Sequence, residues 1–188
     1  MRAASLASLV FSVLAFSPQT PQTSSPPPSW LAPTPMTPSD AHERLAFLVG
    51  TWTLQGFAPD GDFRDTCDWL GAGRRHLVCH ATWTTASGPR EGLSVFSYRA
   101  TDGVYVYQGF RASGAVQMLE GKASNDGRVF EFHGEEGSGS AFTLTRVAIQ
   151  VNADGSVQFK EQTKMGEAGT GTWTPEAVVT YVRVPVRR

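Results

Sequence analysis

Two glutamates and one histidine are the residues of this chain whose types and spacing best fit a catalytic group. Glu120 precedes the turn Asn125-Asp126-Gly127, and Glu131 and His133 follow it. In a simple hairpin register, Glu120 lies opposite Glu131. Met118 then lies opposite His133, so both carboxylates and the imidazole share one face. If that face were inward, repulsion between the glutamates would raise the pKa of one carboxyl, which could act as a general acid or base beside His133.

The same hairpin can also turn this polar face outward. Its reverse face would carry Gln117, Leu119, Phe130 and Phe132. Burying the three apolar side chains of that face is favourable. We therefore expect the outward orientation, and with it no catalytic residue in the chain. A small barrel enzyme, an isomerase or hydrolase that uses Glu120, Glu131 or His133, is kept as an alternative function.

The remaining histidines predict neither a metal site nor a cofactor. His76 and His80 would share one face of a helix, but in a strand their spacing separates them by about 13 Å, too far for one ion. His42 lies near the start of a predicted helix and is expected to be exposed. The sequence has neither a Cys-x-x-Cys-His haem motif nor a Gly-x-Ser-x-Gly elbow or a phosphate loop.

The two cysteines are predicted to form a disulfide between adjacent strands. Cys67 and Cys79 flank the turn Gly71-Ala72-Gly73. The register that brings them together also pairs Phe63 with Trp83, Asp65 with Ala81 and Trp69 with Leu77. Such a bridge is typical of exported proteins. A redox-active pair is the alternative, but it lacks the Cys-x-x-Cys spacing.

The first 38 residues are expected to lie outside the folded domain. Residues 1–16 carry one arginine and then a short uncharged apolar stretch, which is typical of a secretory signal peptide and too short to span a membrane. Residues 17–38 hold eight of the 12 prolines and no charged residue, which predicts a disordered linker. Residues 39–188 then form one domain of ordinary size, exported to the periplasm or to the outside of the cell.

Charge argues against two classes of partner. The chain has 16 basic and 17 acidic side chains, a formal net charge of -1 at pH 7, and its arginines are scattered. This pattern offers no electrostatic footprint for nucleic acid and no polybasic cluster for an anionic membrane. We expect no nucleic-acid partner and no membrane span, and charge does not decide the oligomeric state.

The domain has the pattern of an antiparallel all-β protein. Asp-Gly pairs at 60–61, 102–103, 126–127 and 154–155 separate runs of β-branched and aromatic residues, as hairpin turns require. A meander of this cadence is typical of a barrel or a sandwich. A short helix, capped by Thr37 with Pro38 at its first position, is expected to plug one end. Ten strands are predicted, near residues 46–56, 62–70, 74–85, 91–99, 104–111, 115–123, 128–135, 141–151, 156–165 and 176–184.

Four segments carry motifs of a known family. They are His42 to Trp52 with its Gly50-Thr51-Trp52 motif, Cys67 to Leu77, Gly92 to Tyr98, and Trp173 to Arg183. Together they resemble exported bacterial lipocalin-like (calycin) domains of unassigned function, over nearly all of the domain. The resemblance implies an antiparallel meander that closes into a lipocalin-like β-barrel of about 8–10 strands. It also implies that Gly50, Trp52 and Arg183 have structural roles, with Arg183 on the Trp52 indole in a contact of about 0.5 to 2 kcal/mol.

Alternation along the strands predicts the lining of the barrel. Two apolar faces compete in the hairpin of residues 91–99 and 104–111. We choose the face rich in tyrosine, because tyrosine combines apolar area with one directional hydrogen bond. The expected ligand is a small, mostly apolar molecule, and the other alternative is an interaction domain whose barrel is filled by its own side chains. The predicted ligand-binding residues are Trp52, Trp69, Trp83, Phe96, Tyr98, Tyr105 and Tyr107.

Overall fold

The computed structural model describes residues 40–56, 63–138, 141–164 and 171–185. The predicted signal peptide (1–16) and linker (17–38), the Thr37 cap and the Asp60-Gly61 turn lie outside the described residues. Among those residues, no helix has the length and apolar character needed to cross a membrane.

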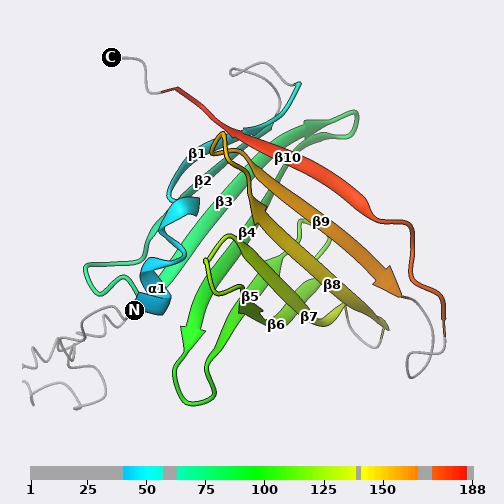
Figure 1. The fold of residues 1–188 in the computed structure, drawn as a ribbon. Helices are drawn as coiled ribbons and strands as arrows, with labels where there is room; N and C mark the ends of the chain where they lie inside the picture. The colour runs from blue at the N-terminus through cyan, green and yellow to red at the C-terminus, as the bar shows by residue number, and fades with distance from the viewer. Residues whose placement is uncertain (1–39, 57–62, 139–140, 165–170, 186–188) are drawn as a thin grey trace, which may run out of the picture. The chain divides into compact units, whose positions relative to one another are not determined.

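Within the described residues, ten antiparallel strands form one closed barrel (Figure 1). Each strand pairs with the next along the chain, and the first pairs with the last. The all-β meander predicted from the turn spacing is therefore confirmed. The strands are β1 (Gly50–Leu54), β2 (Phe63–Trp69), β3 (His76–Thr85), β4 (Gly88–Arg99), β5 (Val104–Phe110), β6 (Val116–Ala123), β7 (Val129–Ser138), β8 (Ala141–Val151), β9 (Val157–Lys164) and β10 (Ala177–Arg183).

Turns form at the three predicted Asp-Gly pairs that the structure describes, 102–103, 126–127 and 154–155. Gly103, Gly127 and Gly155 have φ angles of 69°, 68° and 82°, a region that residues with a Cβ adopt only at a cost. Glycine at these positions lets the chain reverse within a few residues, so the long strands on either side can pair.

The first strand begins later than predicted. Residues 46–48 form a 3-10 helix, η2 (Ala46–Leu48), and β1 starts only at Gly50. Leu45 and Leu48, three residues apart, are both buried, at 1% and 8% exposure. This spacing suits a helical turn, in which both side chains fall on one face, better than a strand. The apolar run was therefore wrongly assigned to a strand at its beginning.

The helix α1 (Asp40–Glu43) and η2 cover one end of the barrel. The Tyr105 hydroxyl donates a hydrogen bond to the Ala41 carbonyl at 3.0 Å, and the ring of Phe47 lies 5.4 Å from that of Phe130. His42 packs edge-on against Tyr98 and is 6% exposed. The expectation that His42 is exposed was wrong, because the helix turns it under the barrel wall.

Gly50, Trp52 and Arg183 join the first strand, β1, to the last, β10, at this closed end. The guanidinium carbon of Arg183 lies 4.4 Å from the centre of the Trp52 ring, as the resemblance implied. Arg183 also donates hydrogen bonds of 2.6 Å to the carbonyls of Phe47 and Val49. A Cβ on Gly50 would lie 2.5 Å from Arg183 Nη1. Glycine at position 50 therefore leaves the space that the guanidinium occupies.

Cys67 and Cys79 form the predicted disulfide between β2 and β3. The predicted register is confirmed with it, since Phe63 pairs with Trp83 and Asp65 with Ala81. Both cysteines are buried on the inner face of the barrel.

Replacing Cys67 and Cys79 together by serine is expected to lower the free energy of unfolding by about 2 to 3 kcal/mol, because the bridge restricts the unfolded chain. Urea denaturation of the variant and of the native protein measures the difference. Native protein treated with a reducing agent should fall to the variant's stability, and the variant should not respond to the agent. A native protein whose stability is unchanged by reduction would contradict the prediction.

Candidate functional site

The barrel encloses a cavity of about 310 Å³. It extends from Leu48 and Trp52, next to the closed end, to Arg111 and Glu161. Most of its wall is aromatic or aliphatic, including Phe63, Trp83, Phe96, Tyr107, Phe159 and Tyr181. Its size and lining are those of a small-molecule site at the lower end of the usual range.

Four of the seven predicted ligand-binding residues line this cavity, namely Trp52, Trp83, Phe96 and Tyr107. Tyr105 and Tyr98 face inward but lie toward α1, where their rings are 5.1 Å apart. Trp69 packs against the core near the β2–β3 turn. The tyrosine-rich face is therefore the inner one, and only part of it borders the cavity.

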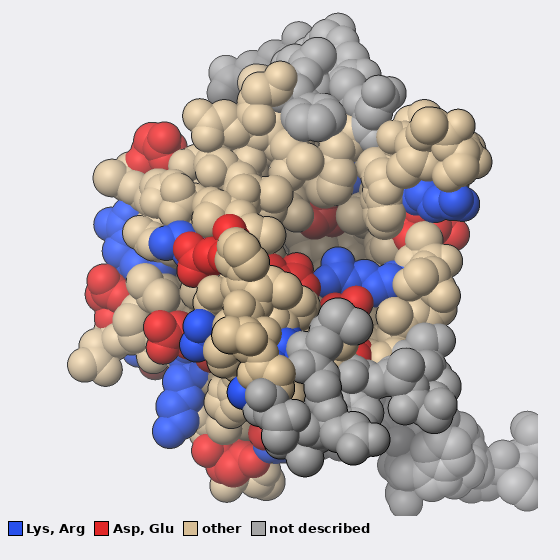
Figure 2. Space-filling view, turned by 90° about the vertical axis from the view of Figure 1, so that its right-hand side faces the viewer, with Lys and Arg blue, Asp and Glu red and all other residues tan. Residues whose placement is uncertain are grey.

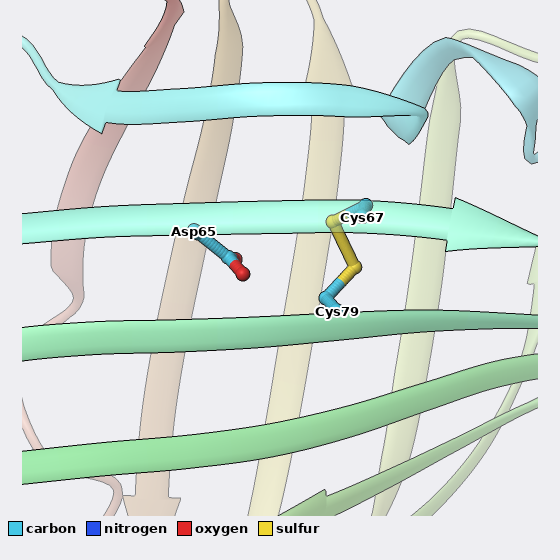
Figure 3. A group of neighbouring side chains, drawn as sticks. All are labelled: Asp65, Cys67 and Cys79. Atoms are coloured by element: carbon cyan, nitrogen blue, oxygen red, sulfur yellow. A yellow bond between two sulfur atoms is a disulfide. The ribbon is translucent and has the colours of Figure 1, made fainter.

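Asp65 is a polar wall residue that the sequence reasoning missed. It projects from β2 on the same side as the disulfide (Figure 3), and it lines the cavity. Its Oδ1 atom is buried and has no hydrogen-bond partner among the described residues. The signal was available, because the register that paired Asp65 with Ala81 places it on the face of Phe63 and Cys67.

Burial raises the pKa of Asp65 to about 6. The cause is the loss of water around the carboxylate, which favours the protonated form, and the nearby His80 offsets a part of that shift. A carboxyl group with such a pKa exchanges its proton near neutral pH. It can also pair with a cation that replaces the lost water.

Asp65 and the two cysteines also bring three candidate metal-ligand atoms within 4.8 Å of one another. Both sulfur atoms are bonded to each other, whereas metals bind the thiolate form of cysteine. In its disulfide form this group therefore offers a metal only the Asp65 carboxylate.

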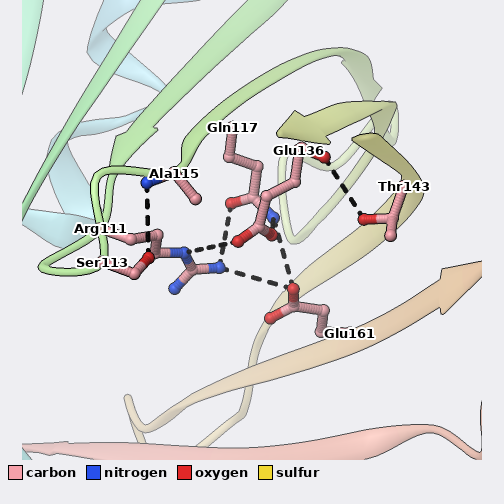
Figure 4. A network of polar contacts seen from close by, with 7 residues as sticks. All are labelled: Arg111, Ser113, Ala115, Gln117, Glu136, Thr143 and Glu161. Carbon is pink, nitrogen blue, oxygen red and sulfur yellow. Dashed lines mark hydrogen bonds and ion pairs between the residues drawn. The ribbon is translucent and has the colours of Figure 1, made fainter. Parts of the chain in front are cut away.

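A charged network lies at the other end of the cavity (Figure 4). Arg111 Nε is 3.4 Å from Glu136 Oε1, and Arg111 Nη2 is 3.5 Å from Glu161 Oε1. Gln117 is fully buried and donates to Glu136 Oε2 at 3.0 Å and to Glu161 Oε1 at 3.3 Å. Figure 2 shows a hollow in the surface with acidic and basic side chains gathered around it. Four side chains from different parts of the meander thus form one polar rim.

The tyrosines of the cavity stay neutral. Burial raises the pKa of Tyr107 to about 12, and it also raises the pKa of Tyr181. The negative charge of Asp65 adds to both shifts. Arg111 remains a cation, because burial acts to lower its pKa but the neighbouring Tyr107, Glu136 and Glu161 raise it overall.

Glu120, Glu131 and His133 are all exposed on the outer face of β6 and β7. The inner face of the same strands carries the buried Leu119, Phe130 and Phe132. The predicted pairing was wrong, since Glu120 lies opposite His133 and Met118 opposite Glu135. Arg99 Nη1 lies 2.8 Å from Glu120 Oε1, and this hydrogen bond lowers the pKa of Glu120. An ion-paired carboxylate in solvent is poorly suited to general acid or base catalysis.

Comparison of the chain with protein-family models and with curated proteins found no match.

Proposed function

We propose that this protein is an exported, lipocalin-like carrier or sensor that binds a small, mostly apolar molecule inside its barrel. The observation that carries the proposal is the cavity of about 310 Å³, with its largely aromatic wall. Pockets of this kind hold ligands mainly by removing apolar surface from water, and a few polar groups orient them. Tyr107, Tyr181 and Asp65 would be those polar groups.

The architecture supports the same proposal. A closed barrel has no free strand edge, so its wall is rigid and its interior is separated from solvent along its length. The end of the barrel next to α1 is covered by Leu45, Leu48 and the Trp52–Arg183 pair. A ligand would enter from the end that carries Arg111 and Glu161. The disulfide supports export, since such bridges persist in oxidising compartments.

The two alternatives have less support. An interaction domain with a filled barrel would not need the cavity. A hydrolase or isomerase built on Glu120, Glu131 and His133 would need them to converge on a substrate, and their side chains lie on the outer face.

Native mass spectrometry of the whole chain, purified gently with its disulfide intact, tests the proposal. We expect a stoichiometric small-molecule adduct that is lost on denaturation and whose mass identifies the ligand. A protein that stays bare after exposure to lipid and metabolite extracts would contradict the proposal and favour the filled-barrel alternative.

A larger side chain in the cavity should weaken ligand binding without harming the fold. Ala81 lines the cavity between Asp65 and Gly92. Ala81→Phe is therefore expected to weaken the binding of N-phenyl-1-naphthylamine, a neutral apolar dye, by at least about tenfold. Dye fluorescence measures the affinity.

Ala148→Phe is the matched control for this variant. Ala148 lies on β8 between the buried Val147 and Ile149, so its own side chain points outward. We expect dye affinity equal to that of the native protein. Equal binding by Ala81→Phe would place the dye site outside the barrel and contradict the cavity assignment.

A further inference from the structure

The ligand's charge can be inferred from Asp65, and this inference rests on the proposed function. We propose that the molecule bound in the cavity carries a cationic amine, which pairs with the Asp65 carboxylate while the rest of the molecule packs against the aromatic wall. The ligand class is thus an amine with an apolar or aromatic body. A neutral apolar molecule would fill the same space without using Asp65.

The first observation is the state of the carboxyl group. Asp65 Oδ1 is buried without a hydrogen-bond partner among the described residues. A buried polar atom in this state costs free energy that a folded protein normally avoids. Here the atom borders a cavity, so a ligand can supply the missing donor. An ammonium group supplies both the donor and the opposite charge, and charge-assisted hydrogen bonds are the stronger kind.

The second observation is the ring of aromatic side chains around the cavity. The distances between ring centres are 5.7 Å for Phe63 and Tyr181, 6.2 Å for Tyr181 and Phe159, and 6.4 Å for Phe159 and Tyr107. Trp83 adds a further ring to the wall. Aromatic faces attract cations, and they do so more strongly where water is excluded. The wall therefore accepts both the apolar body of such a ligand and the charge beside it.

The third observation is the balance of charge along the entry path. Three carboxylates, Asp65, Glu136 and Glu161, share the cavity and its rim with one guanidinium, Arg111. Arg111 is already paired with Glu136 and Glu161, which leaves no cation for Asp65 among these four residues. An excess of negative charge in a concave apolar site attracts cations and repels anions.

The groups that face Asp65 determine how binding depends on pH. Tyr107 and Tyr181 are neutral throughout the physiological range, and Arg111 is a cation. His80 lies on the outer face of β3, where its Nε2 is 3.2 Å from Glu91 Oε2. Because the pKa of Asp65 is about 6, its ionised fraction rises between pH 5 and 7.5, and amine affinity should rise about tenfold over that range.

Three indole probes of one shape test the charge preference. Tryptamine is a cation between pH 5 and 7.5, tryptophol is its neutral alcohol, and indole-3-acetate is an anion. Each competes with N-phenyl-1-naphthylamine for the cavity, and displacement of the dye reports its affinity. At pH 7.5 we expect tryptamine to bind about tenfold or more tightly than tryptophol, and indole-3-acetate to bind most weakly.

Asp65→Asn identifies the residue responsible. We expect this variant to lose about tenfold or more of its tryptamine affinity, together with the pH dependence, and to keep tryptophol affinity within about twofold. His80→Gln is the control, because it removes the imidazole whose charge acts on the Asp65 carboxyl. It should keep the pH dependence of tryptamine binding.

A stability measurement separates lost binding from lost folding. The folded-state pKa of Asp65 is raised, so the native state retains its proton to higher pH than the unfolded chain, and stability falls as pH rises from about 4 to about 6. Asn carries no charge at any of these pH values. At pH 7.5 the Tm of Asp65→Asn should therefore equal or exceed that of the native protein.

The outcomes distinguish the two proposals. Equal affinity for tryptamine and tryptophol, or unchanged tryptamine binding in Asp65→Asn, would overturn the amine proposal and leave the apolar carrier in place. Tighter binding of indole-3-acetate would overturn it as well. A protein that binds neither the dye nor any probe would overturn the proposed function itself.

Discussion

Replacing Trp52 by alanine is expected to lower the free energy of unfolding by about 4 kcal/mol. The Trp52 side chain is 2% exposed, and its indole Nε1 donates a hydrogen bond of 2.7 Å to the Leu48 carbonyl. Its removal would leave a void at the closed end, an unpaired carbonyl and an Arg183 guanidinium without its aromatic partner. Urea denaturation followed by circular dichroism measures the change.

Trp173→Ala provides a matched control for this prediction. Arg146 lies 4.4 Å from the centre of the Trp173 ring, the same distance as Arg183 from Trp52. Trp173 is only partly buried and stands outside the core cluster. Its loss should cost about 1 kcal/mol, because a cation–π contact in solvent contributes less than the burial of an indole. Equal losses in the two variants would mean that burial at Trp52 does not hold the closed end together.

Gly121→Ala is expected to cost about 3 kcal/mol, since it would force two strands apart. A Cβ at this position would lie 2.1 Å from the Glu131 carbonyl oxygen and 2.9 Å from the Phe132 Cα. These are backbone atoms of β7, so no rotation of a side chain can relieve the contact. The pairing of β6 with β7 would have to open at the point where Gly121 lies opposite Phe132.

Gly73→Ala is the control for this second variant. Gly73 lies in the β2–β3 turn, and no described atom lies within 4 Å of the position its Cβ would take. Its stability should stay within about 0.5 kcal/mol of the native protein, as for most surface substitutions. Both variants are compared by the midpoint of urea denaturation. An unchanged midpoint for Gly121→Ala would contradict the close approach of β6 and β7.

The hairpin of β6 and β7 shows how far local reasoning reaches. The predicted centre of this turn was one residue too early, so every predicted cross-strand partner was wrong by two positions. The Ser124 hydroxyl sets the real centre, because it accepts the Val129 N–H at 3.0 Å and bonds to Asp126. A shift of two keeps the alternation of faces intact. The inner residues were therefore predicted correctly although their partners were not.

The amino-acid sequence by itself determined the ten strands, most of their bounds, the three described Asp-Gly turns and the disulfide. These depend on interactions within a few residues: the alternation of apolar side chains, the positive φ that Asp-Gly turns require, and the short separation of Cys67 and Cys79. The structural roles of Gly50, Trp52 and Arg183 were predicted as well, but only from the family resemblance. Physical reasoning along the chain does not connect two segments so far apart in the sequence.

Only the tertiary structure decided which polar side chains meet at the rim and in the cavity of the barrel. The rim joins Arg111, after β5, to Glu136 of β7 and Glu161 of β9, strands that are not neighbours in the sheet. Alternation along β2 places Asp65 on the inner face. Whether its carboxylate finds a hydrogen-bond partner depends on the side chains that the strands across the cavity bring near it, and Oδ1 has none among the described residues. Closure of a barrel brings such residues together through long-range contacts, whereas sequence periodicity specifies only the face on which each side chain lies.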